Sequence, residues 1–523
     1  MDRSEMITRA TERREPWDMV IIGGGAVGMG VAVDAASRGY DVLLVEQHDF
    51  GKGTSSRSTK LVHGGVRYLE QGAVTLVMEA LKERGILRQN APHLVSDLAF
   101  VVPNYEWWEA PFYGVGLKVY DMLAGRYGFG ASEILSKDET LTRLPTIKTE
   151  GLRGGVVYYD GQFDDTRLLI NLAATAIEQG AVAVNYTPAT ALTRDADGFV
   201  DGVVARDLES GREFRAPARV VINATGPQSD IVRRLAHPDA EALIAPSQGI
   251  HLVFDGSFLR GGTAIMVPHT TDGRVMFAIP WHGHTLVGTT DTAITDVPLE
   301  PRPFDEEIEF ILETAGRYLR RPITRADVLS VFVGIRPLVR SQSGGSTASL
   351  SRDHTLHIDP SGLLTIAGGK WTTYRHMAED CVDHAATLAR LPEKPCVTRN
   401  LNVHGFHRQA SNFGSLAVYG SDARLIQDLI RADPALAAPL HPALPYCAAE
   451  VVWAARVEMA RTVEDVLARR TRALFLNAKA ASDMAPETAR LLARELGHDD
   501  EWQTRQIEDF RALAVGYTVP IRD

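Results

Sequence analysis

The stretch from Asp18 to Glu46, DMVIIGGGAVGMGVAVDAASRGYDVLLVE, decides the fold of this chain. A short apolar run, a glycine-rich turn, a run of small residues and a second apolar run predict a strand, a turn, a helix and a parallel strand. Gly23, Gly25 and Gly28 have the spacing G-x-G-x-x-G. The first permits the tight turn, the second lets backbone N–H groups approach a pyrophosphate, and the third lets helix and strand pack closely. The stretch therefore predicts a dinucleotide-binding site.

Glu46 ends the second predicted strand. A carboxylate about 20 residues beyond the glycines can accept hydrogen bonds from ribose hydroxyls, and it disfavours a 2′-phosphate. A glycine triplet alone also occurs as a purely steric turn. The strand, helix and acid around this one favour the cofactor interpretation.

Composition limits the classes of function. The chain has 523 residues, 45% of them apolar, which is enough for two or three domains. A net charge of −11 argues against nucleic acid as the main partner, because phosphate binding needs a basic surface. Three cysteines without C-x-x-C spacing suit a reducing compartment and disfavour a redox-active cysteine pair. We expect no metal site.

Three features bear on membrane contact. The N-terminal residues 1–18 have no apolar core and are expected to be a soluble tail, and no window is apolar enough to span a bilayer. The aromatic segment 105–129 could dip into a membrane interface, although packing inside the protein is the favoured interpretation. A basic cluster at Arg317, Arg320, Arg321 and Arg325 could contact anionic headgroups or could simply be solvated.

The rest of the chain divides by pattern. A buried strand that ends in a small-residue turn recurs at 219–226 and 363–369, whereas residues 246–339 mostly alternate with a period of two. After about residue 400 helical patterns dominate, including 448–467 and a helix that Pro486 opens and Gly497 follows. We predict an α/β protein with a Rossmann-like domain, a mixed-sheet domain and a C-terminal helical domain.

Short polar and glycine-containing segments recur at defined places. They are residues 54–70 (TSSRSTKLVHGGVRYLE), 223–227 (NATGP), 288–291 (GTTD), 334–338 (GIRPL), 351–353 (SRD), 368–375 (GGKWTTYR) and 464–472 (EDVLARRTR). With the glycine motif, their order and spacing resemble the FAD-dependent glycerol-3-phosphate dehydrogenase family over nearly the whole chain. The glycine motif is common to flavoproteins, whereas residues 63–68 and 369–375 are specific.

The resemblance implies an architecture and a reaction. The FAD-binding domain would comprise residues 17–80, 150–240 and 350–395, the substrate-binding domain 81–149 and 241–349, and a helical cap 400–523. The enzyme would oxidise sn-glycerol 3-phosphate to dihydroxyacetone phosphate by hydride transfer to flavin N5. Electrons would then pass to a membrane quinone.

The resemblance also assigns residues. Cofactor contacts would come from Gly23, Gly25, Gly28, Glu46, Thr54, Ser55, Ser58, Lys60, His63, Gly64, Gly65, Ala224, Gly226, Asp291, Gly369, Lys370, Trp371 and Thr372. Substrate contacts would come from Arg67, Tyr68, Thr290, Arg336, Arg352 and Lys370. A dianionic substrate needs fixed cations, although any one arginine taken alone would be a surface or ion-pairing residue.

Lys370 and Thr372 follow a glycine pair at a predicted strand-to-helix junction. The positive potential there would stabilise a reduced flavin, which is anionic near N1 and O2, and an ordinary helix cap is the alternative. Oxidation of an alcohol also needs a base for the hydroxyl proton. His251 and His63 are the candidates, with His251 slightly favoured, and Arg336 and Lys370 complete the expected catalytic set.

Three alternatives stay open at this point. A longer polyol phosphate, such as a tetritol phosphate, could use the same phosphate-binding cations. Oxygen could be the acceptor, as in the oxidase branch of the family, whose extra inserted segment this chain lacks. The protein could also bind flavin without turnover, against which the retained cations argue. We expect a cytoplasmic homodimer in peripheral contact with the cytoplasmic face of the inner membrane.

Overall fold

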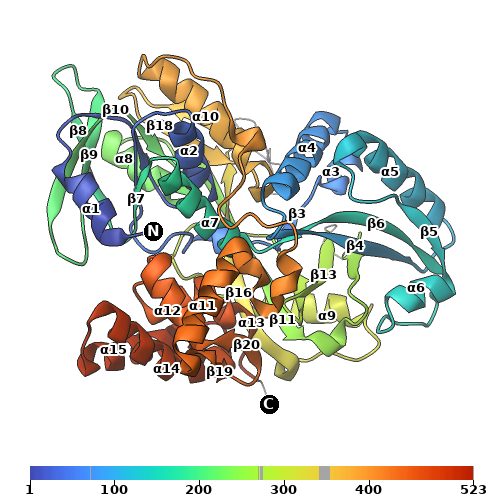
Figure 1. Cartoon of the computed structure of the whole chain (residues 1–523). Helices are drawn as coiled ribbons and strands as arrows, with labels where there is room; N and C mark the ends of the chain where they lie inside the picture. Colours follow the sequence, from blue (N-terminus) through green and yellow to red (C-terminus); the bar gives the residue numbers. More distant parts are fainter. Residues whose placement is uncertain (71, 269, 271–274, 341–353, 522–523) are drawn as a thin grey trace.

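The computed structural model of the chain describes residues 1–523 except 71, 269, 271–274, 341–353 and 522–523, and the side chains of Arg67 and Glu70. Two large sheets lie next to each other, and a helical C-terminal region packs below both of them in Figure 1. This is the α/β architecture with a mixed second sheet and a helical cap that the sequence predicts.

The first sheet contains the predicted strand–turn–helix–strand unit. Its path is β17 (His354–Ile358), β18 (Leu364–Gly368), β10 (Glu213–Asn223), β1 (Trp17–Ile22), β2 (Val42–Val45) and β7 (Val182–Val184), with β8 (Ala189–Arg194) and β9 (Val200–Arg206) beside β10. β1 pairs in parallel with both β10 and β2, so Val20 lies between Val221 and Leu43. All three side chains are fully buried. The apolar runs are thus the centre of a parallel sheet that is covered on both faces.

Helices cover this sheet. They are α1 (Arg3–Glu12), α2 (Ala26–Ser37), α7 (Asp165–Glu178), α8 (Ser229–Ala236) and α10 (Tyr374–Leu388), and α2 packs between α7 and α10. The expectation of a soluble tail at the N-terminus is wrong for α1. The guanidinium of Arg3 is buried and lies 2.6 Å from the carboxylate of Asp207, and this ion pair docks the helix onto the protein.

The second sheet is mixed. Its path is β15 (Thr292–Ala293), β11 (Ile244–Asp255), β14 (His284–Gly288), β13 (Met276–Trp281), β12 (Ala264–Val267), β4 (Val95–Asn104), β6 (Gly154–Phe163) and β3 (Leu61–Val62). β16 (Val328–Val339) pairs with β11, and β5 (Glu133–Ser136) pairs with β6. The predicted boundaries place β3 and β6 in the FAD-binding domain, whereas both strands pair within the second sheet. β6 pairs with β4 along its whole length, which fixes it in the second sheet.

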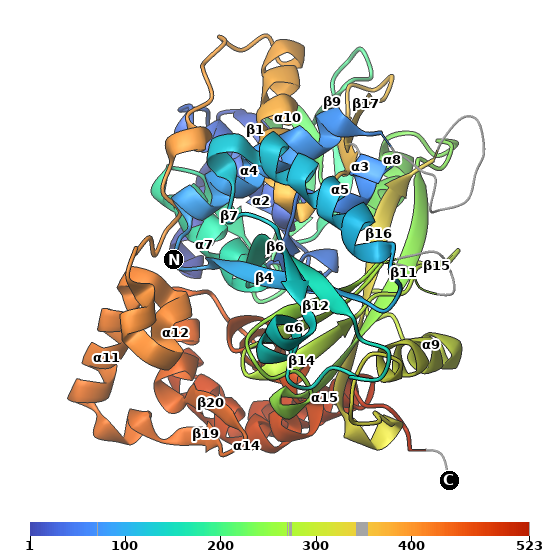
Figure 2. The ribbon, with the colours of Figure 1, turned by 90° about the vertical axis from the view of Figure 1, so that its right-hand side faces the viewer.

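The helices of the second sheet are α3 (Val66–Glu70), α4 (Val74–Asn90), α5 (Glu109–Ala124), α6 (Lys137–Arg143) and α9 (Asp305–Gly316). Figure 2 brings α4 and α5 to the front, where they lie side by side above the sheet. The buried face of α5 includes Leu117 and Tyr120, and the aromatic segment therefore packs on the protein through one face only.

The cap contains α11 (Ala423–Ala432), a small hairpin of β19 (Pro439–His441) and β20 (Leu444–Cys447), α12 (Ala448–Val457), α13 (Ala473–Leu476), α14 (Ala478–Leu496) and α15 (Asp500–Val515). Two helix boundaries differ from those predicted. The helix expected over 448–467 ends at Val457, and α14 begins at Ala478 instead of Pro486. The Asn477 side chain accepts a hydrogen bond from Ala480 N–H and caps α14, so Pro486 lies inside the helix.

Candidate active site

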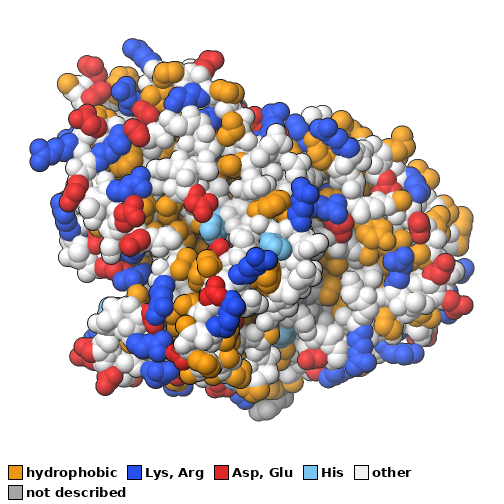
Figure 3. All heavy atoms as spheres, viewed as in Figure 1, with side chains coloured by type: hydrophobic (Ala, Val, Ile, Leu, Met, Phe, Trp, Pro, Cys, Tyr) orange, Lys and Arg blue, Asp and Glu red, His pale blue; other side chains and the backbone are white. Residues whose placement is uncertain are grey.

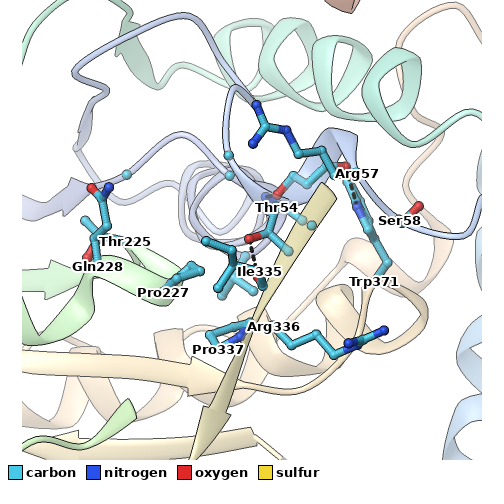
Figure 4. Close-up of a pocket in the computed structure, with 18 of the residues that line it drawn as sticks. Thr54, Arg57, Ser58, Thr225, Pro227, Gln228, Ile335, Arg336, Pro337 and Trp371 are labelled. Atoms are coloured by element: carbon cyan, nitrogen blue, oxygen red, sulfur yellow. Dashed lines mark hydrogen bonds between the residues drawn. The ribbon is translucent and has the colours of Figure 1, made fainter. Parts of the chain in front are cut away.

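A cavity of about 560 Å³ lies between the two sheets and is lined by residues from both. One end is formed by the glycine turn after β1 and by the ends of β2 and β10, and the other by β11, β16 and the turn after β18. Figure 4 shows Thr54, Trp371 and Arg336 around this space, with Arg336 on β16. The carboxyl ends of parallel strands are where open α/β sheets bind ligands.

The glycine turn makes the close approaches that a dinucleotide site needs. Gly23 has φ +111°, and a Cβ there would lie 2.7 Å from the carbonyl oxygen of Ala224 on the neighbouring strand. A Cβ at Gly28 would lie 2.0 Å from the carbonyl oxygen of Gly23. Gly25 is the N-cap of α2 and lines the cavity together with Ala26, so the positive end of this helix lies at the cavity wall. The observed geometry fits a pyrophosphate at this end.

Gly28→Ala is expected to yield a protein with little bound flavin and a lowered melting temperature, because the added methyl group must separate α2 from β1. Gly53→Ala is the matched control, since Gly53 lines the same cavity and a Cβ there would meet nothing within 4 Å. Flavin absorbance per protein and thermal unfolding measure both effects. Equal flavin content in the two variants would contradict the role assigned to Gly28.

Glu46 lies at the end of β2, as predicted. Its partly buried carboxylate accepts hydrogen bonds from Gly24 N–H at 2.6 Å and from His48 N–H at 2.9 Å. Burial raises the pKa of Glu46, while these two backbone hydrogen bonds act in the opposite direction. The acid is therefore fixed at the wall of the cavity, beside the glycine turn, where a ribose contact is expected.

The loop after β2 closes over the cavity. Ser55 Oγ accepts a hydrogen bond from Ala26 N–H at the start of α2, and its carbonyl oxygen accepts one from Trp371 Nε1 at 2.8 Å. Thr54 Oγ1 donates to the carbonyl oxygen of Ile335. Through these three hydrogen bonds the loop connects the start of α2 to the second sheet and to the turn after β18.

The Lys60 side chain, which the resemblance places in the cofactor set, points into the protein interior. Its ammonium is fully buried, lies 2.6 Å from Asp165 Oδ2, and does not line the cavity. Burial lowers the pKa of Lys60 to about 7, although Asp165 acts to raise it. Ser58 lines the cavity but donates its hydroxyl to the same carboxylate at 2.7 Å. Asp165 holds this part of the loop in place.

His251 lies on β11 at the second-sheet end of the cavity. Its ring stacks on Phe332 at 4.9 Å between centroids, and its Nε2 lies 2.9 Å from Thr59 Oγ1. Its Nδ1 has no hydrogen-bond partner among the described residues. Burial, with the positive charges of Lys60 and Arg336, holds the pKa of His251 well below 6.5. A neutral imidazole of this kind can accept a proton.

Arg336 comes from β16, which is antiparallel to β11. Its guanidinium donates to the carbonyl oxygen of Thr290 at 2.9 Å and lies 3.3 Å from the carboxylate of Asp291. Gly249 lies between His251 and Arg336, and a Cβ there would come within 2.5 Å of Arg336 Nη2. The absence of that side chain makes room for the arginine beside the histidine.

The Thr290 hydroxyl is bonded within the protein. Although Thr290 lines the cavity, its hydroxyl donates to Glu307 Oε1 at 2.9 Å and accepts from Ile250 N–H at 3.0 Å. Both hydrogen-bonding directions of this buried hydroxyl are used within the protein. The carbonyl oxygen of Thr290 also accepts a hydrogen bond from Arg336, so the residue positions that side chain, and its predicted substrate contact stays a prediction.

Lys370 and Tyr68 meet above the turn after β18. The Lys370 ammonium lies 3.9 Å from the centroid of the Tyr68 ring, and both residues line the cavity. Thr372 Oγ1 accepts a hydrogen bond from His63 N–H at 3.2 Å, which joins this turn to the His63–Gly65 loop. Lys370, Arg336 and His251 thus share one cavity, although they are far apart in the sequence.

Gly64, the next residue of that loop, is held by a buried hydrogen-bond chain that starts at α5. Gly64 N–H donates to Tyr120 Oη of α5 at 2.8 Å, and a Cβ at Gly64 would lie 2.5 Å from that oxygen. Tyr120 in turn donates to Asp160 Oδ2 at 2.8 Å, and Arg84 lies 2.5 Å from the other oxygen of Asp160. This buried chain connects α5 to the loop over the cavity.

Most predicted residues line the cavity. They are Gly23, Gly25, Glu46, Thr54, Ser55, Ser58, His63, Tyr68, Ala224, Gly226, His251, Thr290, Asp291, Arg336, Gly369, Lys370, Trp371 and Thr372. Gly28, Lys60, Gly64 and Gly65 do not line it. The Arg67 side chain and Arg352 lie outside the described part of the chain, so their predicted substrate contacts stay predictions.

Sequence reasoning missed the residues that support the site. The Arg472 guanidinium donates to the carbonyl oxygen of Ser56 and lies 3.2 Å from Asp165, and Arg470 pairs with Asp49 at 2.6 Å. All of these charges are buried. The signal was present in residues 464–472, whose cluster of arginines is unusual for an exposed helix, but its acidic partners are remote in sequence.

Comparisons with known proteins agree with this geometry. A family model described as FAD dependent oxidoreductase matches residues 18–375, and one described as the C-terminal domain of alpha-glycerophosphate oxidase matches residues 364–503. The mitochondrial glycerol-3-phosphate dehydrogenase of Homo sapiens is 40% identical over 95% of this chain and 72% of its own length. A Caenorhabditis elegans protein named as a probable mitochondrial glycerol-3-phosphate dehydrogenase is 41% identical over 98% of this chain and 75% of its own.

A solved structure agrees over the full length. The glycerol-3-phosphate dehydrogenase of Bacillus halodurans, complexed with FAD, has a TM-score of 0.80 and 31% identity, and the match covers 100% of this chain and 98% of that one.

Proposed function

This chain belongs to the FAD-dependent glycerol-3-phosphate dehydrogenase family, and from that premise we propose its reaction. It oxidises sn-glycerol 3-phosphate to dihydroxyacetone phosphate by hydride transfer to flavin N5. The electrons then pass to a membrane quinone. FAD is the cofactor of the family, and the acceptor and the transfer step are our proposals. A dinucleotide cradle and a group of two cations and a neutral histidine line one cavity, and this observation carries the proposal.

The residues divide the work. The glycine turn, Glu46 and the loop 54–58 would hold FAD, which supplies a two-electron acceptor when bound. Arg336 and Lys370 would bind the phosphate and oxygen atoms of the substrate. His251 would take the proton of the secondary hydroxyl as the C–H bond gives up its hydride, so that the alcohol becomes a ketone. Reduction of a quinone to a quinol then consumes the two electrons, together with two protons.

An anaerobic titration of the purified protein with sn-glycerol 3-phosphate tests this function. We expect stoichiometric bleaching of the visible flavin band, which a quinone analogue reverses more readily than oxygen does. Bound flavin that stays oxidised would contradict the substrate. Faster reoxidation by oxygen than by the quinone analogue would contradict the proposal that a quinone is the acceptor, but not the proposed substrate. A tetritol phosphate in parallel separates the longer substrate from the shorter one.

A quinone lies in a membrane, and one face of α5 suits contact with it. Trp108, Phe112, Val115, Val119 and Met122 follow helical spacing along one side, and Val115 and Met122 are 68% and 80% exposed. Hydrophobic side chains gather over this end of the molecule in Figure 3. No described helix is long and apolar enough to cross a bilayer. An apolar stripe on a surface helix is typical of interfacial binding. We therefore propose that this exposed face of α5 contacts the membrane. The sequence favoured packing inside the protein for the whole aromatic segment, and that interpretation holds only for the other face of the helix.

The basic cluster fits this role less well. Arg325 lies 2.9 Å from Asp305 and 2.7 Å from Glu309, and Arg321 lies 2.9 Å from Asp327. These carboxylates neutralise the positive charge that an anionic headgroup would need. We therefore do not assign the cluster to the membrane contact.

Replacing Phe112 and Met122 by glutamate is expected to abolish binding to phospholipid vesicles while dye-linked oxidation of the substrate continues, because no residue of the exposed stripe lines the cavity. Vesicle flotation measures binding. The control is Leu425→Glu/Val515→Glu, because both residues are exposed and apolar, neither lines the cavity, and the double change adds the same two negative charges elsewhere. Undiminished flotation of the α5 variant would contradict the proposal. The expected homodimer and cytoplasmic location stay predictions.

A further inference from the structure

A second cavity, of about 510 Å³, lies between the C-terminal half of α4, the turn that follows α5, and residues 399–400. None of the described residues that line it lines the dinucleotide cavity. In Figure 3 Lys and Arg side chains lie over this part of the surface. Its volume is in the range of small-molecule sites.

The lining of this cavity is cationic. Lys82, Arg88, Arg126 and Arg399 are part of it, and no carboxylate of the described chain is. Arg88 and Arg399 have acidic partners outside the lining, Asp97 at 2.7 Å and Glu379 at 2.9 Å. For Lys82 and Arg126 the described structure gives no carboxylate partner. An excess of positive charge is thus held in one pocket of a protein whose net charge is −11.

The pocket has a fixed wall. Two arginines contact the Phe129 ring, with Arg84 at 4.1 Å and Arg88 at 4.6 Å from its centroid. Gly85 of α4 lets the turn approach, since a Cβ there would lie 2.4 Å from the Tyr127 ring. Arg126 donates to Tyr127 Oη at 2.7 Å and thereby stays at the rim. Guanidinium groups held in this way suit the planar, two-point binding of phosphate oxygens.

We propose that this pocket binds a phosphate-bearing anion. The same chemistry fits the headgroup of an anionic phospholipid and free phosphate. The headgroup is the source that the location favours, because Arg126 follows directly on α5, whose apolar stripe ends at Met122. The anion site does not depend on the identity of the substrate.

The first arm of the test measures vesicle binding by the full-length flavoprotein. Wild type and Lys82→Gln/Arg126→Gln are floated with phosphatidylcholine vesicles, and with vesicles that contain about one fifth phosphatidylglycerol. We expect the gain in affinity from the anionic lipid to fall roughly 30-fold in the double variant, at about 1 kcal/mol per cation. Lys479→Gln/Arg511→Gln, two exposed cap cations, carries the same charge change and is expected to retain the gain.

The second arm titrates the same proteins with inorganic phosphate by calorimetry. A phosphate site present in wild type and lost in Lys82→Gln/Arg126→Gln, with unchanged vesicle binding, would identify free phosphate as the ligand. Equal behaviour of wild type and the double variant in both arms overturns the proposal. The single variant Arg126→Gln, at an exposed position, serves if the double variant does not fold. Dye-linked turnover is expected to be unchanged throughout, so failure here is distinguishable from failure of the proposed function.

Discussion

Replacement of His251 by asparagine is expected to lower kcat by about 10²- to 10⁴-fold, the range in which a positioned general base contributes. Asparagine keeps a polar atom near Thr59 but cannot take the hydroxyl proton. Anaerobic stopped-flow bleaching of the flavin by sn-glycerol 3-phosphate measures the step directly. His63→Asn is the control, because His63 lines the same cavity. A larger loss in His63→Asn than in His251→Asn would transfer the role of base to His63.

The pH profile gives a second readout for the same residue. A base must be unprotonated to act, so kcat/KM is retained above its pKa and lost as the pH falls through it. The pKa of His251 lies well below 6.5, because burial lowers it most and the positive charges of Lys60 and Arg336 lower it further. We therefore expect a flat profile from pH 6.5 upward and an acid limb only below it. An acid limb above pH 7 would contradict the assignment.

Replacement of Arg336 by alanine is expected to lower kcat/KM by roughly 10³-fold, with most of the loss in KM. Two hydrogen bonds to a charged group are worth about 1.5–3 kcal/mol each, and each 1.36 kcal/mol is tenfold. Steady-state kinetics with a dye acceptor measure the change, and flavin content and melting temperature show whether the protein stays folded.

Arg336→Lys is the matched variant, because it keeps the charge and loses the two-point geometry. We expect it to lie between wild type and alanine. Added guanidinium ion is expected to restore part of the activity of Arg336→Ala. An alanine variant with near-normal kcat/KM would mean that the guanidinium only braces Asp291 and Thr290, to which it is already bonded.

Local patterns predicted the parts of the fold that local physics controls. The run Met19–Ile22 and the glycines after it favour a buried strand and a turn, and the structure has both there. Gly497 ends α14 in a left-handed conformation, as expected, with φ +75°. The predicted start of that helix at Pro486 is wrong, because the cap at Asn477 outweighs one proline inside the helix.

Roles that depend on remote partners could not be predicted in this way. The sequence marks Lys60 and Thr290 as polar residues of motif segments, and only the fold places Asp165 and Glu307 next to them. Ion pairing and hydrogen bonding within the protein then engage both side chains, which the motif segments alone do not reveal. The apolar stripe of α5 is a similar case, since residue spacing defines the two faces of the helix but not which of them the protein covers.

The sequence by itself determined a dinucleotide-binding α/β protein, because turn geometry and strand burial follow from residues that are close along the chain. Only the tertiary structure decided which side chains act together. His251 and Arg336 share a cavity because β11 and β16 pair antiparallel, and the cap arginines hold the loop over the cavity through charges that are remote in sequence. Burial and ion pairing set the protonation state of each side chain and decide whether it can contact a ligand. Burial and ion pairing are both properties of the folded chain.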